Sequence, residues 1–330
     1  MNLSEFGIVC PACKSEIEIQ DGCATCPSCQ IDYPLIHGIV DLRYPPVDDG
    51  GATKTMAEEF HQSSFDELLC IMLWEHELSP QMYADTLAYY HDQFARTERM
   101  LTMFENQITK HFKSPQPERV LDLGCGSGAG VRVLSNRFNQ VIGLDVSLAQ
   151  LLLAQKMLEN TPIINYQLIC GYANRLPFKD QSVDSIQAIN VLEHVMTIEP
   201  VLSEISRILI SGGIFIADSR NRFDIFFPEP HTGIRFLGFL PQKFIPKFVQ
   251  WRKKTHYEQT RLLSYGKLHK AMRNHFRGVY RIDFPDVKAY RQPKWVDQLV
   301  TLIKKFTFLS KLTLRIFPTH IVVGKKSDEV

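Results

Sequence analysis

Between residues 119 and 218, short apolar runs alternate with segments in which apolar residues recur every three to four positions. The short runs have the length and the β-branched content of strands that are buried on both faces. They cover residues 120–123, 141–144, about 165–170, 183–189 and 213–217. The periodic segments predict helices at 128–137, 147–158 and 199–210, the second with Ser147 as its N-cap. This alternation indicates right-handed βαβ units and a parallel sheet.

Regions with a different pattern flank this alternation. Residues 54–113 carry one apolar stripe at helical spacing, which predicts a helical cap. The stripe consists of Leu87, Tyr90, Phe94, Leu101, Phe104, Ile108 and Phe112. Residues 221–275 are rich in Phe, Pro, Arg and Lys and predict an insertion over the carboxyl edge of the sheet. With two last strands at 279–283 and 320–323, the predicted fold is α/β: a doubly wound, mostly parallel, seven-stranded sheet.

Composition divides the chain into parts that we expect to be separate domains. Residues 1–44 hold five of the eight cysteines and predict a compact module of short strands. The stretch 44–51 is rich in Pro, Asp and Gly, as linkers are. The helical cap or linker at 54–113 follows, and residues 114–330 are expected to form the main domain, with its insertion at about 221–275.

The overall composition is that of an ordinary folded soluble protein. Hydrophobic residues make up 45% and charged residues 22% of the 330 positions. No apolar run reaches the ~18 residues of a membrane span, and the N-terminus lacks a basic start followed by a long apolar stretch. We therefore expect a cytoplasmic protein.

Charge is distributed unevenly along the chain. Residues 221–330 contain 22 Lys and Arg against 8 Asp and Glu, whereas the first 220 residues contain 15 against 28. A basic half favours an anionic partner, such as a phosphate-bearing substrate, a nucleic acid or a lipid surface, although solvated lysines give the same composition. Residues 299–317 predict a basic amphipathic helix, which either rests on an anionic membrane or packs on the sheet with its cations in water.

Two Cys-x-x-Cys pairs near the N-terminus predict a metal site. Cys10 and Cys13 form the first pair, and Cys26 and Cys29 form the second, twelve residues further on. Each pair offers two thiolates from one tight turn, and two pairs complete the tetrahedral site of a structural Zn²⁺. Four thiolate ligands leave no open position for catalysis. Cys23 is the expected spare, and the alternative is a set of reduced, partly buried thiols.

A glycine-rich turn follows the first predicted strand. Asp122 ends the apolar run, and Gly124, Gly126 and Gly128 come directly after it. Glycine lets a ligand approach the backbone closely, because it has no Cβ and tolerates positive φ. The second predicted strand ends in Asp145, an acid suited to the two hydroxyls of a ribose. The pattern predicts a nucleoside cofactor on a doubly wound sheet.

Several motifs over 119–218 resemble the class I S-adenosylmethionine-dependent methyltransferases. The matching segments, in order, are VLDLGCGSG at 120–128, Asp145, GYANRLPF at 171–178 with Asp184, NVLEH at 190–194 and SGG at 211–213. The LPF and NVLEH segments have no counterpart in an NAD-binding fold. The resemblance implies that Asp122 attracts the methionine ammonium through water, that Asp145 binds the ribose, that Ala173 faces the adenine and that Asn190 lines the methyl-transfer mouth. Tyr172 departs from the family, which has an acid there to hold the adenine amino group.

Two further segments suggest partners for this domain. Residues 33–42 resemble the end of small zinc-ribbon proteins that bind and activate certain methyltransferases, here fused to the enzyme. The Pro-Glu-Pro-His turn at 228–231 follows the fifth strand, at the carboxyl edge where ligands bind. We expect His231 to act as the base for a hydroxyl acceptor, with Glu229 orienting it, although a structural histidine fits the turn as well. Arg220, Arg222 and Arg235 are candidate anion contacts.

Three functions remain open at this point. The first is O-methylation of a small-molecule, glycan or lipid-linked acceptor, which the 228–231 turn and the apolar, cationic insertion favour. The second is RNA methylation, with the zinc module and the basic half on the phosphates. Acids outnumber bases around the cysteines, which speaks against it. The third is a non-catalytic regulatory protein with a methyltransferase fold, for which Tyr172 is the main argument. The acceptor and the oligomeric state cannot be deduced from the chain.

Overall fold

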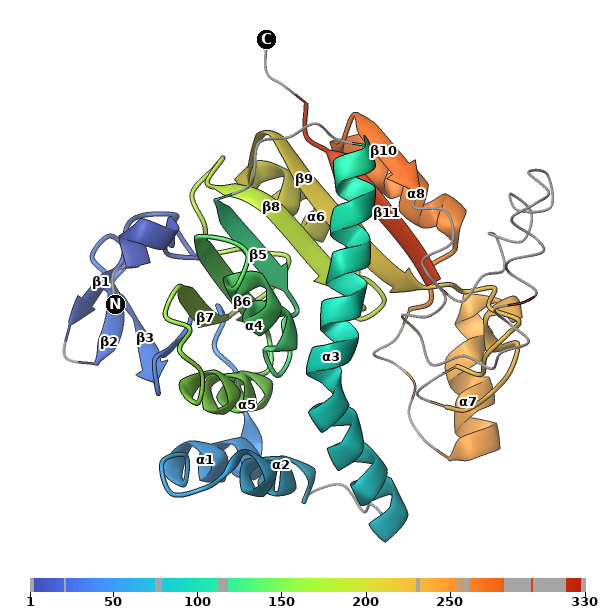
Figure 1. Ribbon diagram of the computed structural model, residues 1–330, viewed down its shortest axis with the longest axis horizontal. Helices are drawn as coiled ribbons and strands as arrows, with labels where there is room; N and C mark the ends of the chain where they lie inside the picture. The colour runs from blue at the N-terminus through green and yellow to red at the C-terminus, as the bar shows by residue number, and fades with distance from the viewer. Residues whose placement is uncertain are drawn as a thin grey trace. The chain divides into compact units, whose positions relative to one another are not determined.

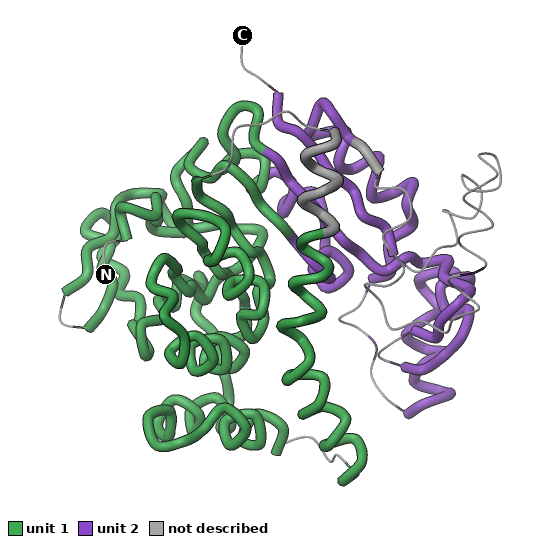
Figure 2. Tube along the Cα trace, in the orientation of Figure 1, with its two compact units in different colours: residues 1–187, 204–213 green, residues 188–203, 214–330 purple. Residues whose placement is uncertain are grey.

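The computed structural model describes most of the chain, in two compact units. The described residues are 3–20, 22–74, 79–111, 118–229, 232–254, 257, 261–281, 298 and 319–327. The first unit comprises residues 1–187 and 204–213, and the second comprises residues 188–203 and 214–330 (Figure 2). The predicted amphipathic helix at 299–317 lies outside the described residues. Within them, no helix is both long enough and apolar enough to cross a lipid bilayer.

The first unit is built on a mixed sheet (Figure 1). After a short 3-10 helix, η1 (Leu3–Phe6), its strands are β1 (Glu18–Gln20), β2 (Cys23–Cys26), β3 (Ile31–Ile36), β4 (Ile39–Asp41), β5 (Arg119–Leu123), β6 (Gln140–Asp145) and β7 (Tyr166–Cys170). Their spatial order is β1-β2-β3-β4-β7-β6-β5. The strands β1 to β4 pair antiparallel, whereas β4, β7, β6 and β5 run parallel. The cysteine-bearing segment therefore extends the parallel sheet.

Five helices belong mainly to the first unit. They are α1 (Gly50–Glu58), α2 (Phe65–Leu73), α3 (Pro80–His111), α4 (Ala129–Ser135) and α5 (Leu148–Glu159). The helix α5 packs on β6 and β7 and also against α1 and α2, and its leucines at 151–153 are fully buried. Ser147 is its N-cap, as predicted, because its hydroxyl accepts the amide of Gln150 at 3.3 Å. Ser64 caps α2 in the same way and forms a capping box with Glu67.

Most of the predicted elements after residue 119 are confirmed. Strands at 120–123, 141–144 and 165–170 appear as β5, β6 and β7, and the helices at 128–137 and 147–158 appear as α4 and α5. Ahead of them the predicted cap consists of three helices, and α1 begins at Gly50, inside the predicted linker. Residues 112–117, between the last of these helices and β5, lie outside the described residues.

The second unit contains the end of the α/β pattern and the insertion. The strand β8 (Val183–Ile189), the helix α6 (Ile198–Ile208) and the strand β9 (Leu209–Arg220) each pass from one unit to the other. The insertion is helical: η2 (Leu237–Phe239), η3 (Gln242–Phe244), α7 (Ile245–Lys253) and α8 (Tyr265–His275). A small apolar core of Leu237, Ile245, Val249 and Tyr257 holds its first part together.

The last strands correct the expectation of a mostly parallel sheet. The strand β11 (Thr319–Lys325) pairs antiparallel with both β9 and β10 (Gly278–Arg281). Among the described residues, the chain after residue 119 does form seven strands. Antiparallel pairing at β9, β11 and β10, together with strands β1–β4 of the first module, makes the sheet mixed. Hydrophobic patterning could not show this, because an apolar strand has the same pattern in either direction.

Candidate cofactor site and cysteine cluster

The glycine-rich turn forms a tight loop between β5 and α4. The amides of Gly124 and Cys125 donate to the carbonyl of Leu144, at 2.7 and 3.1 Å, which holds the loop against the end of β6. Gly124, Gly126 and Gly128 all have positive φ, at 71°, 52° and 84°. A Cβ at Gly128 would lie 2.8 Å from the Cβ of Ala154 on α5, whereas a Cβ at Gly126 would be in ordinary contact with the side-chain oxygen of Gln150, at 3.8 Å. The loop thus leaves its backbone accessible at Gly126.

Asp122 is buried beneath this loop. Only 4% of the residue is exposed, and its Oδ1 accepts the side-chain amide of Gln187 at 2.9 Å. A Cβ at Gly130 would collide with its other carboxylate oxygen, so the glycine makes room for the acid. Burial raises the pKa of Asp122 to about 6; the hydrogen bond from Gln187 opposes the shift and the charge of Asp145 adds to it. The acid is therefore held in a site that penalises its negative charge.

Asp145 lies at the end of the neighbouring strand and faces the same loop. Its Oδ2 accepts the amide of Gly126 at 2.9 Å, and its Oδ1 accepts the amide of Ser147 at 2.9 Å. The parallel register of β5 and β6 pairs Asp122 with Gly143 and so brings both strand ends to the same edge. The carboxylate remains partly exposed, unlike that of Asp122. The structure thus brings together both predicted acids and the glycine loop within one unit.

The helix α3 contributes two polar residues that the sequence did not indicate. Gln93 is 8% exposed, and its Oε1 accepts the hydroxyl of Ser127, in the glycine loop, at 2.8 Å. Its amide nitrogen, Nε2, is buried and has no hydrogen-bond partner among the described residues. One turn earlier, the hydroxyl of Tyr90 accepts the side-chain amide of Gln150 at 2.9 Å. Tyr90 belongs to the predicted apolar stripe, but a single polar residue such as Gln93 beside a stripe gives no signal in the pattern.

The remaining predicted cofactor residues are less enclosed. Tyr172 and Ala173 are half-buried, and the phenol of Tyr172 donates to the carbonyl of Pro45 at 3.2 Å. Asn190 belongs to the second unit, is exposed and adopts a positive φ of 54°. Its amide donates to the carbonyl of Asp218 at 2.9 Å.

The four predicted ligand cysteines come together, each pair in the same kind of turn. The sulfurs of Cys10, Cys13, Cys26 and Cys29 all lie within 4.8 Å of one another. After the first pair, the amide of Lys14 donates to the carbonyl of Cys10 at 2.8 Å, and after the second, Gln30 donates to Cys26 at 2.9 Å. Both donors have positive φ, 61° and 55°. Cys23 is not part of the group, as the spacing predicted.

Hydrogen bonds join the cysteine module to the segment that follows Tyr172 and Ala173. The amide of Val9 donates to the carbonyl of Pro177 at 2.9 Å. The ammonium of Lys14, next to a cysteine turn, donates to the carbonyl of Leu176 at 2.8 Å and lies 3.3 Å from the carboxylate of Glu204. Lys179 and Glu16 form a further ion pair at 2.6 Å, which is exposed and contributes little. The residues that directly follow the candidate adenine residues are thus bonded to the cysteine module.

The predicted catalytic pair is only half described. His231 lies outside the described residues. The Oε2 of Glu229 accepts the amide and the hydroxyl of Thr232, at 2.7 and 2.8 Å, so this carboxylate stabilises its own loop. Its charge, together with burial as the main cause, raises the pKa of the Tyr257 phenol.

The arginines expected to bind anions are used within their own unit. The guanidinium of Arg222 donates to the carbonyls of Gly238 and Leu240, both at 2.7 Å. Arg220 lies 3.7 Å from the carboxylate of Asp224, and Arg235 donates to the carbonyl of Phe226 at 3.1 Å. Their donors support the fold of the insertion.

Comparison with known proteins agrees with the geometry of the first unit. Residues 121–217 match the family described as "Methyltransferase domain". The chain is 33% identical over 144 residues to an uncharacterized protein of Methanocaldococcus jannaschii, covering 43% of this chain and 52% of that protein. It is 33% identical over 143 residues to an O-methyltransferase of Aspergillus nomiae, covering 42% of this chain and 61% of that one. The chain thus spans about half the length of these relatives.

Solved structures give a similar but weaker match. The crystal structure of the YcgJ protein from Bacillus subtilis is 18% identical, with a TM-score of 0.43, and the match covers 68% of this chain and 98% of that one. The matched family, the glycine loop and the two strand-end acids coincide in the same hundred residues. Over residues 121–217, the chain is thus similar to the methyltransferase domain family.

Proposed function

We propose that the protein transfers a methyl group from S-adenosylmethionine to an oxygen of a small-molecule, glycan or lipid-linked acceptor. The observation that carries the proposal is the placement of Asp145 against the backbone of Gly126, at the carboxyl ends of two parallel strands, inside the matched domain. Ligands of open α/β sheets bind at this edge. The relative named as an O-methyltransferase supports oxygen as the accepting atom.

The residues of the first unit fit the parts of that cofactor. Asp145 presents carboxylate oxygens to the ribose hydroxyls, and the buried charge of Asp122 attracts the methionine ammonium. The unpaired amide of Gln93 is a donor for the methionine carboxylate, which would satisfy a buried polar group that is otherwise costly. Tyr172 and Ala173 are the proposed adenine residues, and Asn190 stays the predicted residue for the transferable methyl group.

Methyl transfer to the acceptor mainly requires that its oxygen is aligned with the methyl group and that a base takes up the hydroxyl proton. Bound S-adenosylmethionine supplies a methyl group already activated by the sulfonium, so in-line positioning contributes most of the rate. His231 is the proposed base for the acceptor hydroxyl. Glu229 is proposed as a positioning residue, because its carboxylate accepts the amide and the hydroxyl of Thr232, the residue that follows His231 in the sequence.

We propose further that the cysteine cluster holds a structural Zn²⁺. Sulfurs around a tetrahedral zinc lie about 3.8 Å apart, given a Zn–S distance of ~2.3 Å. The measured distances fit: Cys10 to Cys29 is 3.6 Å and Cys13 to Cys26 is 3.4 Å. Free thiols have no comparable reason to converge in this way.

Calorimetric titration with S-adenosylmethionine and S-adenosylhomocysteine tests the cofactor assignment. We expect micromolar binding, weakened at least about tenfold in Asp145→Asn, because that change removes a charge-assisted bond worth ~1.5–3 kcal/mol. Glu159→Gln, at an exposed position in the same unit, is the matched control and should bind normally. Thermal melting checks that Asp145→Asn is folded. Equal affinity of the folded variant and the wild type would overturn the site.

A further inference from the structure

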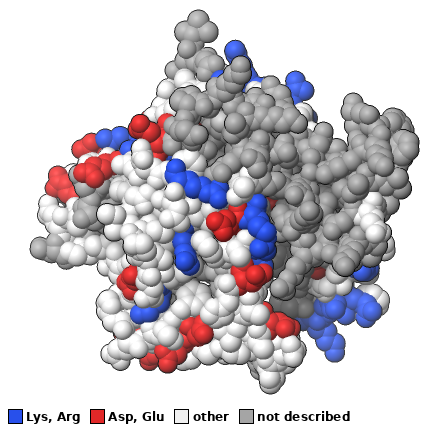
Figure 3. Space-filling view, viewed as in Figure 1, with Lys and Arg blue, Asp and Glu red and all other residues white. Residues whose placement is uncertain are grey.

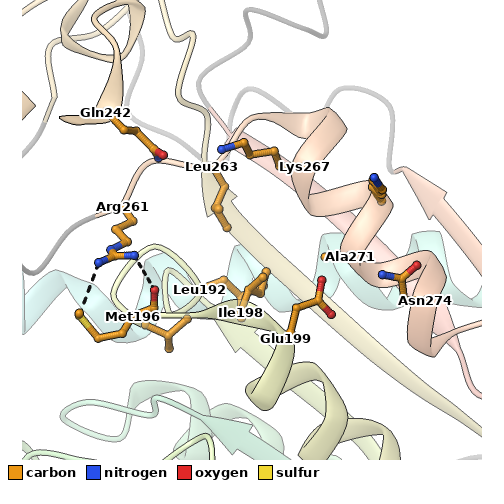
Figure 4. A pocket seen from close by; sticks show the side chains of 12 residues that line it. Leu192, Met196, Ile198, Glu199, Gln242, Arg261, Leu263, Lys267, Ala271 and Asn274 are labelled. Carbon is orange, nitrogen blue, oxygen red and sulfur yellow. Dashed lines mark hydrogen bonds between the residues drawn. The ribbon is translucent and has the colours of Figure 1, made fainter. Parts of the chain in front are cut away.

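The described residues that line a cavity of about 370 Å³ all belong to the second unit. One side is the segment after β8, one is the helix α8 and a third is the strand-like stretch that leads into α8 (Figure 4). Its volume falls within the ~300–1,000 Å³ typical of small-molecule sites. Nothing assigned to the protein so far occupies this cavity.

One wall of the cavity is a face of α8. Lys267, Lys270, Ala271 and Asn274 line it; the last three follow Lys267 by three, four and seven positions, which places all four on one side of a helix. Figure 4 shows Asn274 pointing from this helix toward Glu199, and Lys267 extending toward Leu263. The helix is well defined, with Ser264 as its N-cap and Leu268 and Met272 buried on the other side.

The opposite wall is mainly apolar and is held in place by a fixed arginine. Leu192, Ile198 and Leu263 supply the apolar surface. The guanidinium of Arg261 donates to the carbonyl of Met196 at 2.8 Å, and the amide of Arg261 donates to the carbonyl of Glu193 at 2.6 Å. These bonds join the two segments that form this wall of the cavity. The wall is therefore formed before any ligand binds (Figure 4).

Among the described residues that line the cavity, cations outnumber acids. Lys267 and Lys270 are exposed, and their ammonium groups have no ionic partner among the described residues. The acid at the rim, Glu199, is already 3.0 Å from the imidazole of His275. Arg261 adds a third cation. Two ammonium groups without a described ionic partner lie next to an apolar wall. This arrangement suits a ligand with an anionic and an apolar part.

We propose that this cavity binds an amphiphilic anion, with its phosphate or carboxylate at Lys267 and Lys270 and its apolar part on Leu192, Ile198 and Leu263. The proposal rests on the proposed function, since such an amphiphile is the acceptor class that it names. Nucleic acid fits less well, because single strands are held by stacking on aromatic side chains, and none of the described residues that line this cavity is aromatic.

Calorimetry with octyl phosphate tests the cavity. We expect it to bind at least tenfold more tightly than octyl glucoside, which has no charge, and than inorganic phosphate, which has no chain. In Lys267→Ala/Lys270→Ala the affinity should fall at least tenfold. The matched control is Arg273→Ala/Arg277→Ala, which removes two exposed charges outside the cavity and should leave the affinity unchanged.

Two further readouts keep this test separate from the cofactor test. Leu263→Ser should weaken octyl phosphate and leave inorganic phosphate unchanged, because it alters the apolar wall alone. All these variants should bind S-adenosylmethionine as the wild type does, so a failure of the cofactor assignment is recognised independently. Equal affinity of the lysine variant and the wild type for octyl phosphate would overturn the cavity proposal. So would an RNA oligonucleotide that displaces octyl phosphate at lower concentration.

Discussion

Asp122 illustrates how one buried acid links the stability of the fold to pH. Its pKa of about 6, raised from 3.8, means that the folded chain keeps a proton which the unfolded chain loses between these values. Stability without ligand therefore falls as the pH rises through that window. A full shift corresponds to at most about 3 kcal/mol, at ~1.4 kcal/mol per unit.

Asp122→Asn should remove this pH dependence. Above pH 6.5 we expect the unliganded variant to melt at a higher temperature than the wild type, with the difference disappearing near pH 4. The gain should come with weaker binding of S-adenosylmethionine, because the charge that attracts its ammonium is gone. Melting curves between pH 4 and pH 8 make the comparison, and parallel curves for the two proteins would contradict the assigned pKa.

Gln93 is a residue whose substitution is expected to weaken the binding of S-adenosylmethionine more than it lowers the free energy of unfolding. Its buried Nε2 has no described partner, so Gln93→Ala removes no bond from that nitrogen. It does remove the acceptor of the Ser127 hydroxyl, at a cost of about 1 kcal/mol. We expect affinity for S-adenosylmethionine to fall about five- to tenfold by calorimetry. Gln81→Ala, exposed on the same helix, is the control. Unchanged affinity in Gln93→Ala would remove it from the site.

At the scale of elements, the pairing of β4 with β7 makes the cysteine module part of the first unit. Val40 and Asp41 pair with Ile169 and Cys170 at the edge of the parallel sheet. The module also holds the carbonyls of Leu176 and Pro177, just after the candidate adenine residues. A metal that orders the module should therefore stabilise both the sheet edge and the cofactor site.

Loss of a metal ligand should be felt at the cofactor site. In Cys26→Ser we expect less than one zinc per chain, a melting temperature lower by several degrees and severalfold weaker binding of S-adenosylmethionine. Atomic absorption, melting curves and calorimetry measure the three effects. Cys23→Ser is the matched control, since its sulfur is not in the cluster, and should behave as the wild type. Full zinc content and unchanged melting in Cys26→Ser would exclude the structural role.

At the scale of the whole molecule, the uneven charge bears on the choice between a small acceptor and RNA. Figure 3 shows Lys and Arg side chains gathered over α7, which bears Lys247, Arg252 and Lys253. Neutralising many phosphates makes binding collapse between about 50 and 200 mM salt, whereas a small ligand releases few ions. We expect acceptor binding to change less than about fivefold over that range. A thousandfold loss would favour the RNA alternative.

The local sequence was sufficient to predict most helices and strands, and also the glycine turn and the acids that directly follow the strands. Strand and helix periods, the N-cap at Ser147, the glycine turn and the acids at 122 and 145 all depend on neighbours within a few residues. The two cysteine pairs converge as their spacing predicts, since each turn is built by its own backbone bonds. Interactions of this range are encoded in adjacent positions and can be deduced from one sequence.

Contacts between distant segments required the folded chain. The sequence did not place Gln93 beside Ser127, pair β4 with β7, or direct β11 antiparallel to β9. It also predicted anion contacts at Arg220 and Arg222, whose guanidinium groups donate to backbone carbonyls within the fold. Which partner a side chain meets depends on how segments far apart along the chain pack together. The periodicity of a sequence indicates on which face of a helix or strand a residue lies, but not which residues it contacts there.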